Sequence, residues 1–181
     1  ERFIRLPERL YADDPCFVPP LRAERREALS PRKNPYFQHA EAQFFLAQRG
    51  GRDVGRISAQ VDQLGRDGEG HFGLLAAEDD PEVFAALLAA AEAWLRDRAR
   101  REVVGPFSLS INEESGLLVD GFGTPPMLLM PHDPPYAAGH IEHCGYAKAK
   151  DTIAYLYEIE RDLPVAARRL IATRRPAGLE V

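Results

Sequence analysis

A strongly patterned helical segment lies between two predicted strands near the middle of the chain. Asp80 is a good N-cap residue and Pro81 suits the first helical position, so a helix is predicted to begin there and to end near Arg100. Apolar residues then recur at helical spacing and form one apolar stripe: Phe84, Leu87, Leu88, Ala91 and Leu95. The flanking segments, 71–76 and 102–111, are both predicted as strands, the second of them buried. A strand–helix–strand unit of this kind predicts that the two strands are parallel neighbours in one sheet.

An antiparallel meander is predicted before this unit. Segment 42–47 is apolar and rich in aromatic residues, and the Gly-Gly pair after it favours a tight turn into a second strand, 54–61. A polar loop, 65–70, then leads to the strand 71–76, and three closely spaced strands favour antiparallel pairing. One face of the second strand is apolar by alternation: Ile57, Ala59 and Val61.

Shorter elements are predicted on either side of this sheet. Two helices, 6–11 and 21–29, precede it, and a proline-containing break follows each of them. The loop 112–135 comes after the βαβ unit and is rich in Pro, Gly and Asp, and a loop this long inside a compact domain is usually functional or mobile. A short helix follows over 136–144, with Gly145 at its C′ position.

The last part of the chain is predicted to contain a strand and then a linker. Segment 153–159 is predicted as the final strand, and the tail, 161–181, is basic and carries a helical pattern before Pro176. The chain begins at Glu1 without an initiator methionine and ends inside an unfinished pattern, so a fragment of a longer protein is expected. We therefore predict one α/β domain over residues 1–160, with the tail as a linker or as the start of a further domain.

Charge and cysteine content exclude several classes of protein. The formal net charge is −5, so the chain has no global basic field that would hold a nucleic acid backbone. Arg22, Arg25 and Arg26 are interleaved with acids and are interpreted as a solvated face. Two cysteines cannot build a metal framework and favour a reducing compartment, so a cytoplasmic location and no metal site are predicted. No apolar run approaches the length of a membrane span, so no transmembrane segment is predicted.

The order of the predicted elements resembles the fold of the GNAT acyltransferases. Segment 140–148 resembles the part of that family in which a short helix ends in a glycine and an aromatic residue. The Asn within 110–113 resembles an Asn that follows the facing strand in the same family. The resemblance covers residues 3–159 and implies a mixed sheet of the α/β (α+β) class: an antiparallel N-terminal meander joined to a βαβ unit, with helices on both faces.

Three further segments, 13–20, 34–37 and 112–121, resemble a bacterial group of longer GNAT-like proteins, some of whose relatives are linked to ceramide synthesis, an N-acylation. The resemblance implies transfer of an acyl group from acetyl-CoA or acyl-CoA to an unknown amine, either a small molecule or a lipid precursor. It also allows a second GNAT-like half after Val181, or a homodimer. Two alternatives stay open: a catalytically inactive GNAT-like half that shapes the substrate site or interface of a longer protein, and an acyl-chain binding module.

The coenzyme A site that the resemblance implies is altered in this sequence. The family binds the pyrophosphate at the N-terminus of the helix after the meander, where free N–H groups and the helix dipole favour an anion. Segment 76–82 contains neither Gly nor Arg, carries four carboxylates and has Pro81 where a donor is needed. We therefore expect weak or absent coenzyme A binding at this helix, and binding through backbone groups of the strand 71–76 or through a second half instead. The candidate cofactor-binding residues are Leu74, Leu75, Ala76, Glu82 and Val83.

Proton transfer is assigned to two segments. The family places a Tyr on the short helix, a few residues before the glycine and the aromatic residue, whereas this chain carries His140 and Ile141 there and Tyr136 further back. His140 is a candidate proton shuttle because histidine titrates near neutrality, and Tyr136 is a further candidate catalytic residue. Glu113 and its neighbour Glu114 are candidate general bases, and Asn112 is a candidate for orienting the acceptor or the pantetheine. Each assignment has a structural alternative: a histidine without a catalytic role, solvated carboxylates, and an Asn that caps its loop.

The end of the long loop carries the candidate substrate-binding residues Met127, Leu128 and Met130. Methionine and leucine make soft, adaptable apolar surface. Segment 125–131 is therefore predicted either to line a groove for an acyl chain or to plug the gap between splayed strands, and the sequence favours neither over the other.

Overall fold

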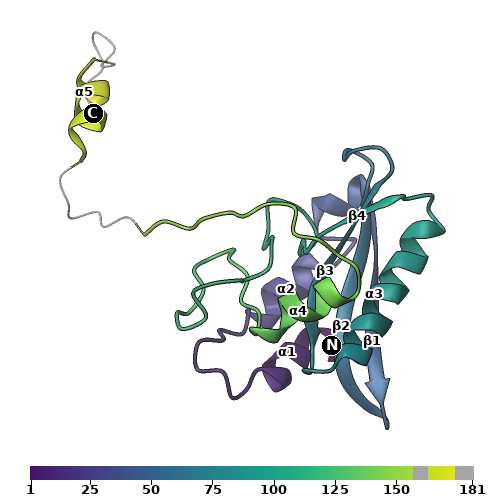
Figure 1. Cartoon of the computed structure of the whole chain (residues 1–181). Helices are drawn as coiled ribbons and strands as arrows, with labels where there is room; N and C mark the ends of the chain where they lie inside the picture. Colours follow the sequence, from purple (N-terminus) through teal and green to yellow (C-terminus); the bar gives the residue numbers. More distant parts are fainter. Residues whose placement is uncertain (157–162, 174–181) are drawn as a thin grey trace. The chain divides into compact units, whose positions relative to one another are not determined.

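The computed structural model describes residues 1–156 and 163–173 of the chain, which divides into two compact units, Glu1–Ala149 and Lys150–Val181. The first unit holds the sheet, and the second holds the last described helix, α5 (Val165–Thr173) (Figure 1). α5 confirms the helical pattern predicted in the tail. Within the described ranges, every helix is too short or too polar to cross a lipid bilayer.

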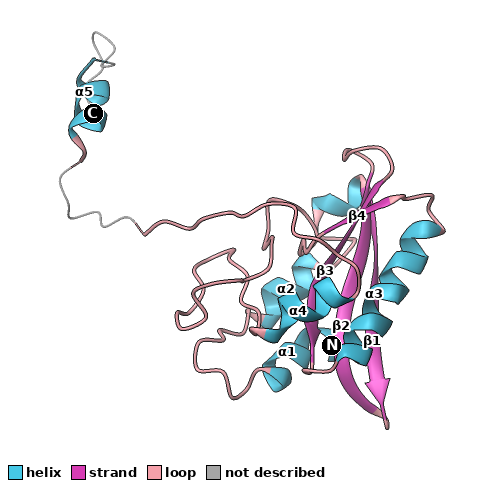
Figure 2. Ribbon diagram, viewed as in Figure 1, coloured by secondary structure: helices cyan, strands magenta, loops and turns pink. Residues whose placement is uncertain are grey.

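The fold is mixed α/β, and its sheet has four strands in the order β1-β2-β3-β4 (Figure 2). The strands are β1 (Ala40–Arg49), β2 (Arg52–Asp62), β3 (Glu69–Ala77) and β4 (Glu102–Val104). The first three pair in antiparallel fashion and β4 pairs with β3 in parallel, so both the predicted meander and the predicted parallel pair are confirmed. The β1–β2 turn needs its two glycines because Gly50 and Gly51 have φ angles of 58° and 77°, in the left-handed region.

One face of the sheet is covered by α3 (Pro81–Arg96), which begins where the sequence predicts. The carboxylate of Asp80 caps the helix by accepting a hydrogen bond from the Glu82 N–H at 2.9 Å. The apolar stripe packs on the alternating residues of β2, and Gly55 marks a close approach, since a Cβ there would lie 2.7 Å from Leu87 Cδ1. Each large buried side chain of the stripe contributes about 1.5–3 kcal/mol, so this face forms the main core.

The end of α3 differs from the prediction, since the helix stops at Arg96 and not near Arg100. The N–H groups of Arg98 and Arg100 both bond the Leu95 carbonyl, and Ala99 has a φ angle of 57°. A left-handed residue at this position closes a helix and satisfies its last carbonyls. The chain therefore turns directly into β4.

The predicted strand 102–111 is wrong beyond its first three residues. β4 ends at Val104, and Pro106 has no N–H to donate to a ladder. The chain then turns back on itself, because Ser108 N–H bonds the Glu114 carbonyl at 2.8 Å and Gly116 N–H bonds the Pro106 carbonyl at 2.8 Å. Residues 107–111, which were expected to extend the sheet, therefore form part of a loop.

The opposite face of the sheet is covered by α1 (Arg2–Leu10) and the 3-10 helix η1 (Pro35–Gln38), and α2 (Arg22–Ala28) packs on α1. α2 confirms the predicted second helix, whereas α1 begins at Arg2 and not at residue 6. Pro7 lies inside α1 and does not start it. A small apolar cluster on this side packs the helices onto the sheet, and its buried members are Tyr36, Leu74 and Leu109.

The segments after the sheet are partly as predicted. α4 (Tyr136–His143) confirms the short helix, and Gly145 has the left-handed φ angle, 93°, that a C′ residue adopts. Residues 112–135 contain no helix or strand, as expected of the long loop. Residues 153–156 of the predicted final strand are not in a strand, and the remainder of it, 157–159, lies outside the described residues.

Candidate functional site

A row of three polar side chains on β2 is fully enclosed, and we call it the polar row: Arg56, Ser58 and Gln60. Their exposed fractions are 6%, 0% and 0%. They alternate with the apolar residues that face α3, so they point to the side of the sheet that α1 and η1 cover. The polar face of an antiparallel sheet is commonly solvated, and a buried one needs hydrogen-bond partners for its side chains.

Arg56 is a buried cation that contacts no carboxylate among the residues that the structure describes. Its Nη1 donates to the Phe3 carbonyl at 2.7 Å, and its guanidinium carbon lies 4.9 Å from the centre of the Phe3 ring. This carbonyl is available because Pro7, four residues further along α1, has no N–H to bond it. Burial, and secondly the charge of Arg25, lower the pKa of Arg56 to about 9, so the guanidinium is still charged at neutral pH.

Several atoms around the polar row have no hydrogen-bond partner within the described parts of the chain. Gln60 Nε2 donates to the Phe107 carbonyl at 2.7 Å, but its Oε1 is unpaired. Further unpaired buried atoms are Arg56 Nε, Ser58 Oγ and Tyr36 Oη. A buried polar group left unpaired costs about 1–3 kcal/mol, so a concentration of them at one place calls for an explanation, such as a binding site.

The loop after β4 brings carboxylates to the same side of the sheet. Arg25 Nη2 lies 2.6 Å from Glu114 Oε1, and the Arg25 side chain is only 10% exposed. The interpretation of Arg25 as part of a solvated face is therefore wrong, because it is enclosed with Glu114. Burial raises the pKa of the neighbouring Glu113, and the charge of Arg25 opposes that shift.

Asp133 and Tyr11 add two titratable groups to this region. Burial raises the pKa of Asp133 to about 6, and the hydrogen bond from the Leu118 N–H at 3.0 Å opposes that shift. Burial also raises the pKa of Tyr11, with the charges of Tyr136 and Asp133 acting in the same direction, and the charge of Arg56 lowers it. Tyr11 therefore lies close enough to Arg56 and to Asp133 to interact with both charges.

A β-bulge lies directly beside the polar row. Arg56 pairs with Ala76 and Ser58 pairs with Gly73, so two residues of β3, Leu74 and Leu75, lie opposite the single β2 residue between these pairs. Leu74 has a φ angle of 47°, which is unusual for a residue with a branched side chain. Bulges and left-handed residues of this kind cluster at functional sites, where they redirect backbone groups.

The N-terminus of α3 is already occupied by side chains of this chain. Arg49 pairs with Asp80 and also with Glu82 at 2.8 Å, and Arg52 pairs with Glu78 at 2.6 Å. The N–H groups of Glu82, Val83 and Phe84 bond to the side chain or carbonyl of Asp80. Few free donors remain for an anion, so residues 76–83 do not fit the pyrophosphate of coenzyme A.

The two candidate residues on α4 pack against this same end of α3. Tyr136 Oη donates to the Ala77 carbonyl at 2.8 Å, and burial raises the pKa of Tyr136 to about 12. His140 Nε2 lies 2.7 Å from Asp79 Oδ1, and its ring lies 4.8 Å from that of Phe84. Both side chains thus have clear packing roles, and their catalytic assignments stay predictions.

The other predicted residues lie at separate places. Asn112 is exposed in a turn, where its N–H bonds Ser110 Oγ at 3.3 Å. Met127, Leu128 and Met130 are exposed, so they do not plug a gap in the sheet. Of the candidate cofactor residues, Leu74, Ala76 and Val83 are buried, Leu75 is half-buried and Glu82 is exposed.

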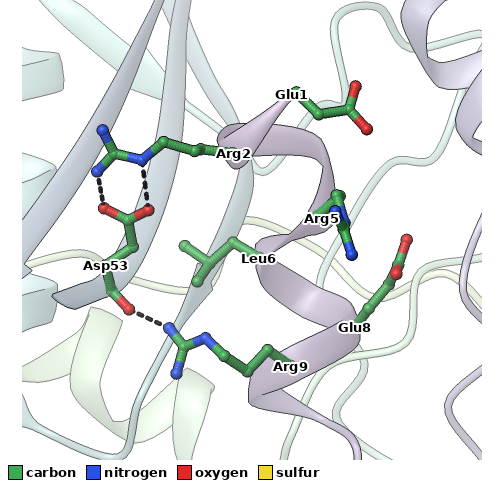
Figure 3. A pocket seen from close by; sticks show the side chains of 7 residues that line it. All are labelled: Glu1, Arg2, Arg5, Leu6, Glu8, Arg9 and Asp53. Carbon is green, nitrogen blue, oxygen red and sulfur yellow. Dashed lines mark hydrogen bonds and ion pairs between the residues drawn. The ribbon is translucent and has the colours of Figure 1, made fainter.

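An open depression of about 480 Å³ is lined by α1 and by Asp53 of β2 (Figure 3). Much of its charged lining is already paired: Arg2 and Arg9 both bond Asp53 from the two ends of the helix, and Glu1 and Glu8 pair with Arg26 and Arg22. We do not place the functional site there, since Arg2 and Arg9 are both paired and solvated. The residues that line it are Glu1, Arg2, Arg5, Leu6, Glu8, Arg9 and Asp53.

The sequence interpretation missed Arg56, Tyr11 and Asp133. The signal for Arg56 is present in the sequence, because it is the single charged residue in the segment 54–61, where Ile57, Ala59 and Val61 alternate as the apolar face. No local pattern marks Tyr11 or Asp133, which are brought to the sheet only by the path of the loops.

These features define a mixed α/β unit with a bulged central strand and a buried polar site on one face of its sheet. No family model matches the chain, and no solved structure matches it significantly. The chain is 58% identical over 185 residues to the bacterial ceramide synthase of Caulobacter vibrioides (strain NA1000 / CB15N), an alignment that covers 99% of this chain and 48% of that protein. It is 52% identical over 157 residues to Protein YghO of Escherichia coli (strain K12), with 84% of this chain and 40% of that protein aligned. The chain thus spans about half the length, or less, of the curated relatives it matches.

Proposed function

We propose that the chain is part of an N-acyltransferase of the GNAT type that transfers an acyl group from acyl-CoA to the amine of a lipid precursor. The observation that carries the proposal is the polar row, where the buried cation of Arg56, which contacts no carboxylate of the described residues, lies beside a β-bulge. The identity of 58% to a protein named bacterial ceramide synthase supports this choice of reaction, because making a ceramide is an N-acylation.

The element order supports a GNAT-type layout. An antiparallel meander, a covering helix, a parallel fourth strand and a short helix follow one another as in that family. The parallel pairing of β3 and β4 covers three residues, and the chain stays close to β3 after it, because the Phe107 N–H bonds the Phe72 carbonyl at 2.8 Å.

The chain itself can supply a base that deprotonates the acceptor amine. An amine reaches the site as an ammonium and must lose a proton before its lone pair can attack a carbonyl. A carboxylate with a pKa of about 6, as at Asp133, is ionised at neutral pH and accepts that proton readily. Glu113, whose pKa burial also raises, is a second candidate for this role.

The proposed binding site for acyl-CoA is not the N-terminus of α3. Because residues 76–83 do not fit the pyrophosphate, we propose that acyl-CoA binds through backbone groups at the bulge of β3 or through a part of the longer protein that has no counterpart here. The exposed residues Met127, Leu128 and Met130 are not assigned to the acyl chain.

The alternative function is a catalytically inactive half of a longer enzyme. The filled N-terminus of α3 favours it, and so does the coverage of 48% of the ceramide synthase. Under this alternative the polar row would shape the acceptor site while another segment held the cofactor.

An acyl-transfer assay tests the proposal. The chain is incubated with a long-chain amine and either acetyl-CoA or a long-chain acyl-CoA, and amide formation is measured by mass spectrometry. We expect amide product, and we expect Arg56→Met to lower kcat/KM by at least about tenfold because the variant keeps the stem but removes the charge. Arg66→Met is the matched control, since the Arg66 side chain is 73% exposed.

Two outcomes would contradict the proposal. Equal rates in Arg56→Met and the wild type would show that the polar row takes no part in acyl transfer. A chain that forms no amide with either donor, but that is required for amide formation by a longer homologue, would establish the inactive half.

A further inference from the structure

The end of the long loop presents four apolar side chains to solvent, and we call residues 127–130 the apolar tip. The exposed fractions are 65% for Met127, 90% for Leu128, 55% for Leu129 and 36% for Met130. In Figure 1 the loop that carries the tip extends away from the sheet of the first unit. Four consecutive apolar residues at this exposure are costly for a protein surface that contacts only water.

The tip has a defined local structure. The Met130 N–H bonds the Met127 carbonyl at 3.1 Å, and Leu129 has a φ angle of 62°. This is a β-turn with Leu128 and Leu129 at its two corners. Prolines before and after the turn, at 125–126 and 131, reduce the freedom of the chain, so little entropy is lost when the tip contacts a partner.

The tip carries no charge. Residues 121–132 contain no Asp, Glu, Lys or Arg. His132, the single titratable residue in that segment, is bonded to Asp14 at 2.8 Å and its side chain is 5% exposed. Moving the tip out of water therefore incurs no desolvation penalty for a charged side chain. The tip also has no cation that would attract an anionic surface.

These properties fit a lipid bilayer better than a folded partner. A stable protein–protein interface buries about 800 Å² on each side, which is more than four partly exposed side chains supply. A bilayer needs no complementary groove, so it can accept a convex apolar turn. The binding free energy becomes more favourable with each CH₂ group that leaves water. The turn is also short, so its polar backbone groups need enter no deeper than the headgroup region.

We propose that the apolar tip inserts into the interfacial region of a lipid bilayer and docks this face of the protein on the membrane. The attraction is apolar, so binding does not depend on anionic lipid or on salt. The docking does not require acyl transfer, although a lipid-precursor acceptor would be met at the same surface.

Vesicle co-sedimentation of the whole chain, without amine or acyl donor, tests this inference. Vesicles of phosphatidylcholine, with or without phosphatidylglycerol, are compared. We expect similar binding to both, changing less than about twofold between about 0.05 and 0.5 M salt. The variant Leu128→Asp with Leu129→Asp is expected to bind at least about tenfold less, and Asp is tolerated at the left-handed position. Leu64→Asp is the control, because Leu64 is 77% exposed in another turn.

A second reporter does not depend on the double variant. In Leu128→Trp, the added indole is expected to shift its emission to shorter wavelength with vesicles and to be quenched by brominated phosphatidylcholine. No binding by the wild type, binding only to anionic vesicles, or unchanged binding by the double variant would each overturn the inference. Self-association that the double variant abolishes, without vesicle binding, would instead assign the tip to a second copy of the chain.

Discussion

Replacing Arg56 by methionine should stabilise the fold while lowering the proposed acyl-transfer activity. Each pKa unit corresponds to about 1.4 kcal/mol, so lowering the pKa of Arg56 from the ordinary value of a guanidinium to about 9 means that keeping the charge in the folded state costs about 5 kcal/mol. The variant loses the hydrogen bond to the Phe3 carbonyl, which costs about 1–3 kcal/mol, and the contact of the cation with the Phe3 ring, which costs about 1 kcal/mol more. The expected net effect is a gain of about 1–3 kcal/mol in the free energy of unfolding.

Urea unfolding followed by circular dichroism measures this gain. A chain of this size should also show a rise in Tm of roughly 2–4 °C for each kcal/mol. Arg66→Met, at an exposed site, should change the free energy of unfolding by less than about 0.5 kcal/mol. Destabilisation of Arg56→Met by more than about 1 kcal/mol would refute the reasoning, because it would make the arginine a structural residue.

The pH dependence gives an independent check on the same variant. The folded pKa of Arg56 is lowered to about 9, so between about pH 9 and the ordinary pKa of a free guanidinium the unfolded state binds more protons than the folded state. The wild type therefore gains stability as the pH rises through about 9, and the advantage of Arg56→Met shrinks there. Below pH 9 both states are protonated and the advantage should stay constant.

Three further predictions concern the sheet, the base and the cofactor. Gly73→Ala should cost several kcal/mol or prevent folding, since its Cβ would lie 1.6 Å from a backbone oxygen, whereas Gly123→Ala, with open space around it, should leave Tm unchanged. Asp133→Asn should abolish the fall in kcat/KM that the wild type is expected to show below about pH 6, and should lower the plateau above it. Because the folded pKa of Asp133 is raised, the wild type gains stability as the pH falls through about 6, so any stability advantage of Asp133→Asn at pH 7 should disappear near pH 4. Asp79→Gly with Asp80→Arg should raise the affinity for coenzyme A in isothermal titration, and unchanged affinity would show that charge at this helix end is not the obstacle.

The elements that local chemistry determines could be predicted from the sequence. Asp80 and Pro81 fix the start of α3, and the glycines at 50–51 fix the β1–β2 turn, because each of these residues satisfies a backbone need at its own position. The strand predicted over 102–111 failed because an apolar run says nothing about whether a neighbouring strand accepts its hydrogen bonds. Pro106, within that run, argues against a strand, because proline has no N–H to donate to a neighbouring strand.

The candidate site was harder to predict than the fold. The alternation in β2 identifies the apolar face, which includes Ile57, but does not show what covers the other face. Arg56 becomes a buried cation only because α1 is placed over it, and Asp133 reaches the region only through a long loop. Contacts between residues so distant along the chain leave no local pattern, so the site required the tertiary structure.

Pro7, inside α1, influences the register in which that helix packs on the sheet. Within the middle of α1 the Phe3 carbonyl receives no N–H from the following turn, so both of its lone pairs are open to a guanidinium from the sheet. If α1 slid by one residue, Arg56 would face an oxygen that already accepts one hydrogen bond. The missing donor therefore favours one register of the helix on the sheet, together with the bonds of Arg2 and Arg9 to Asp53.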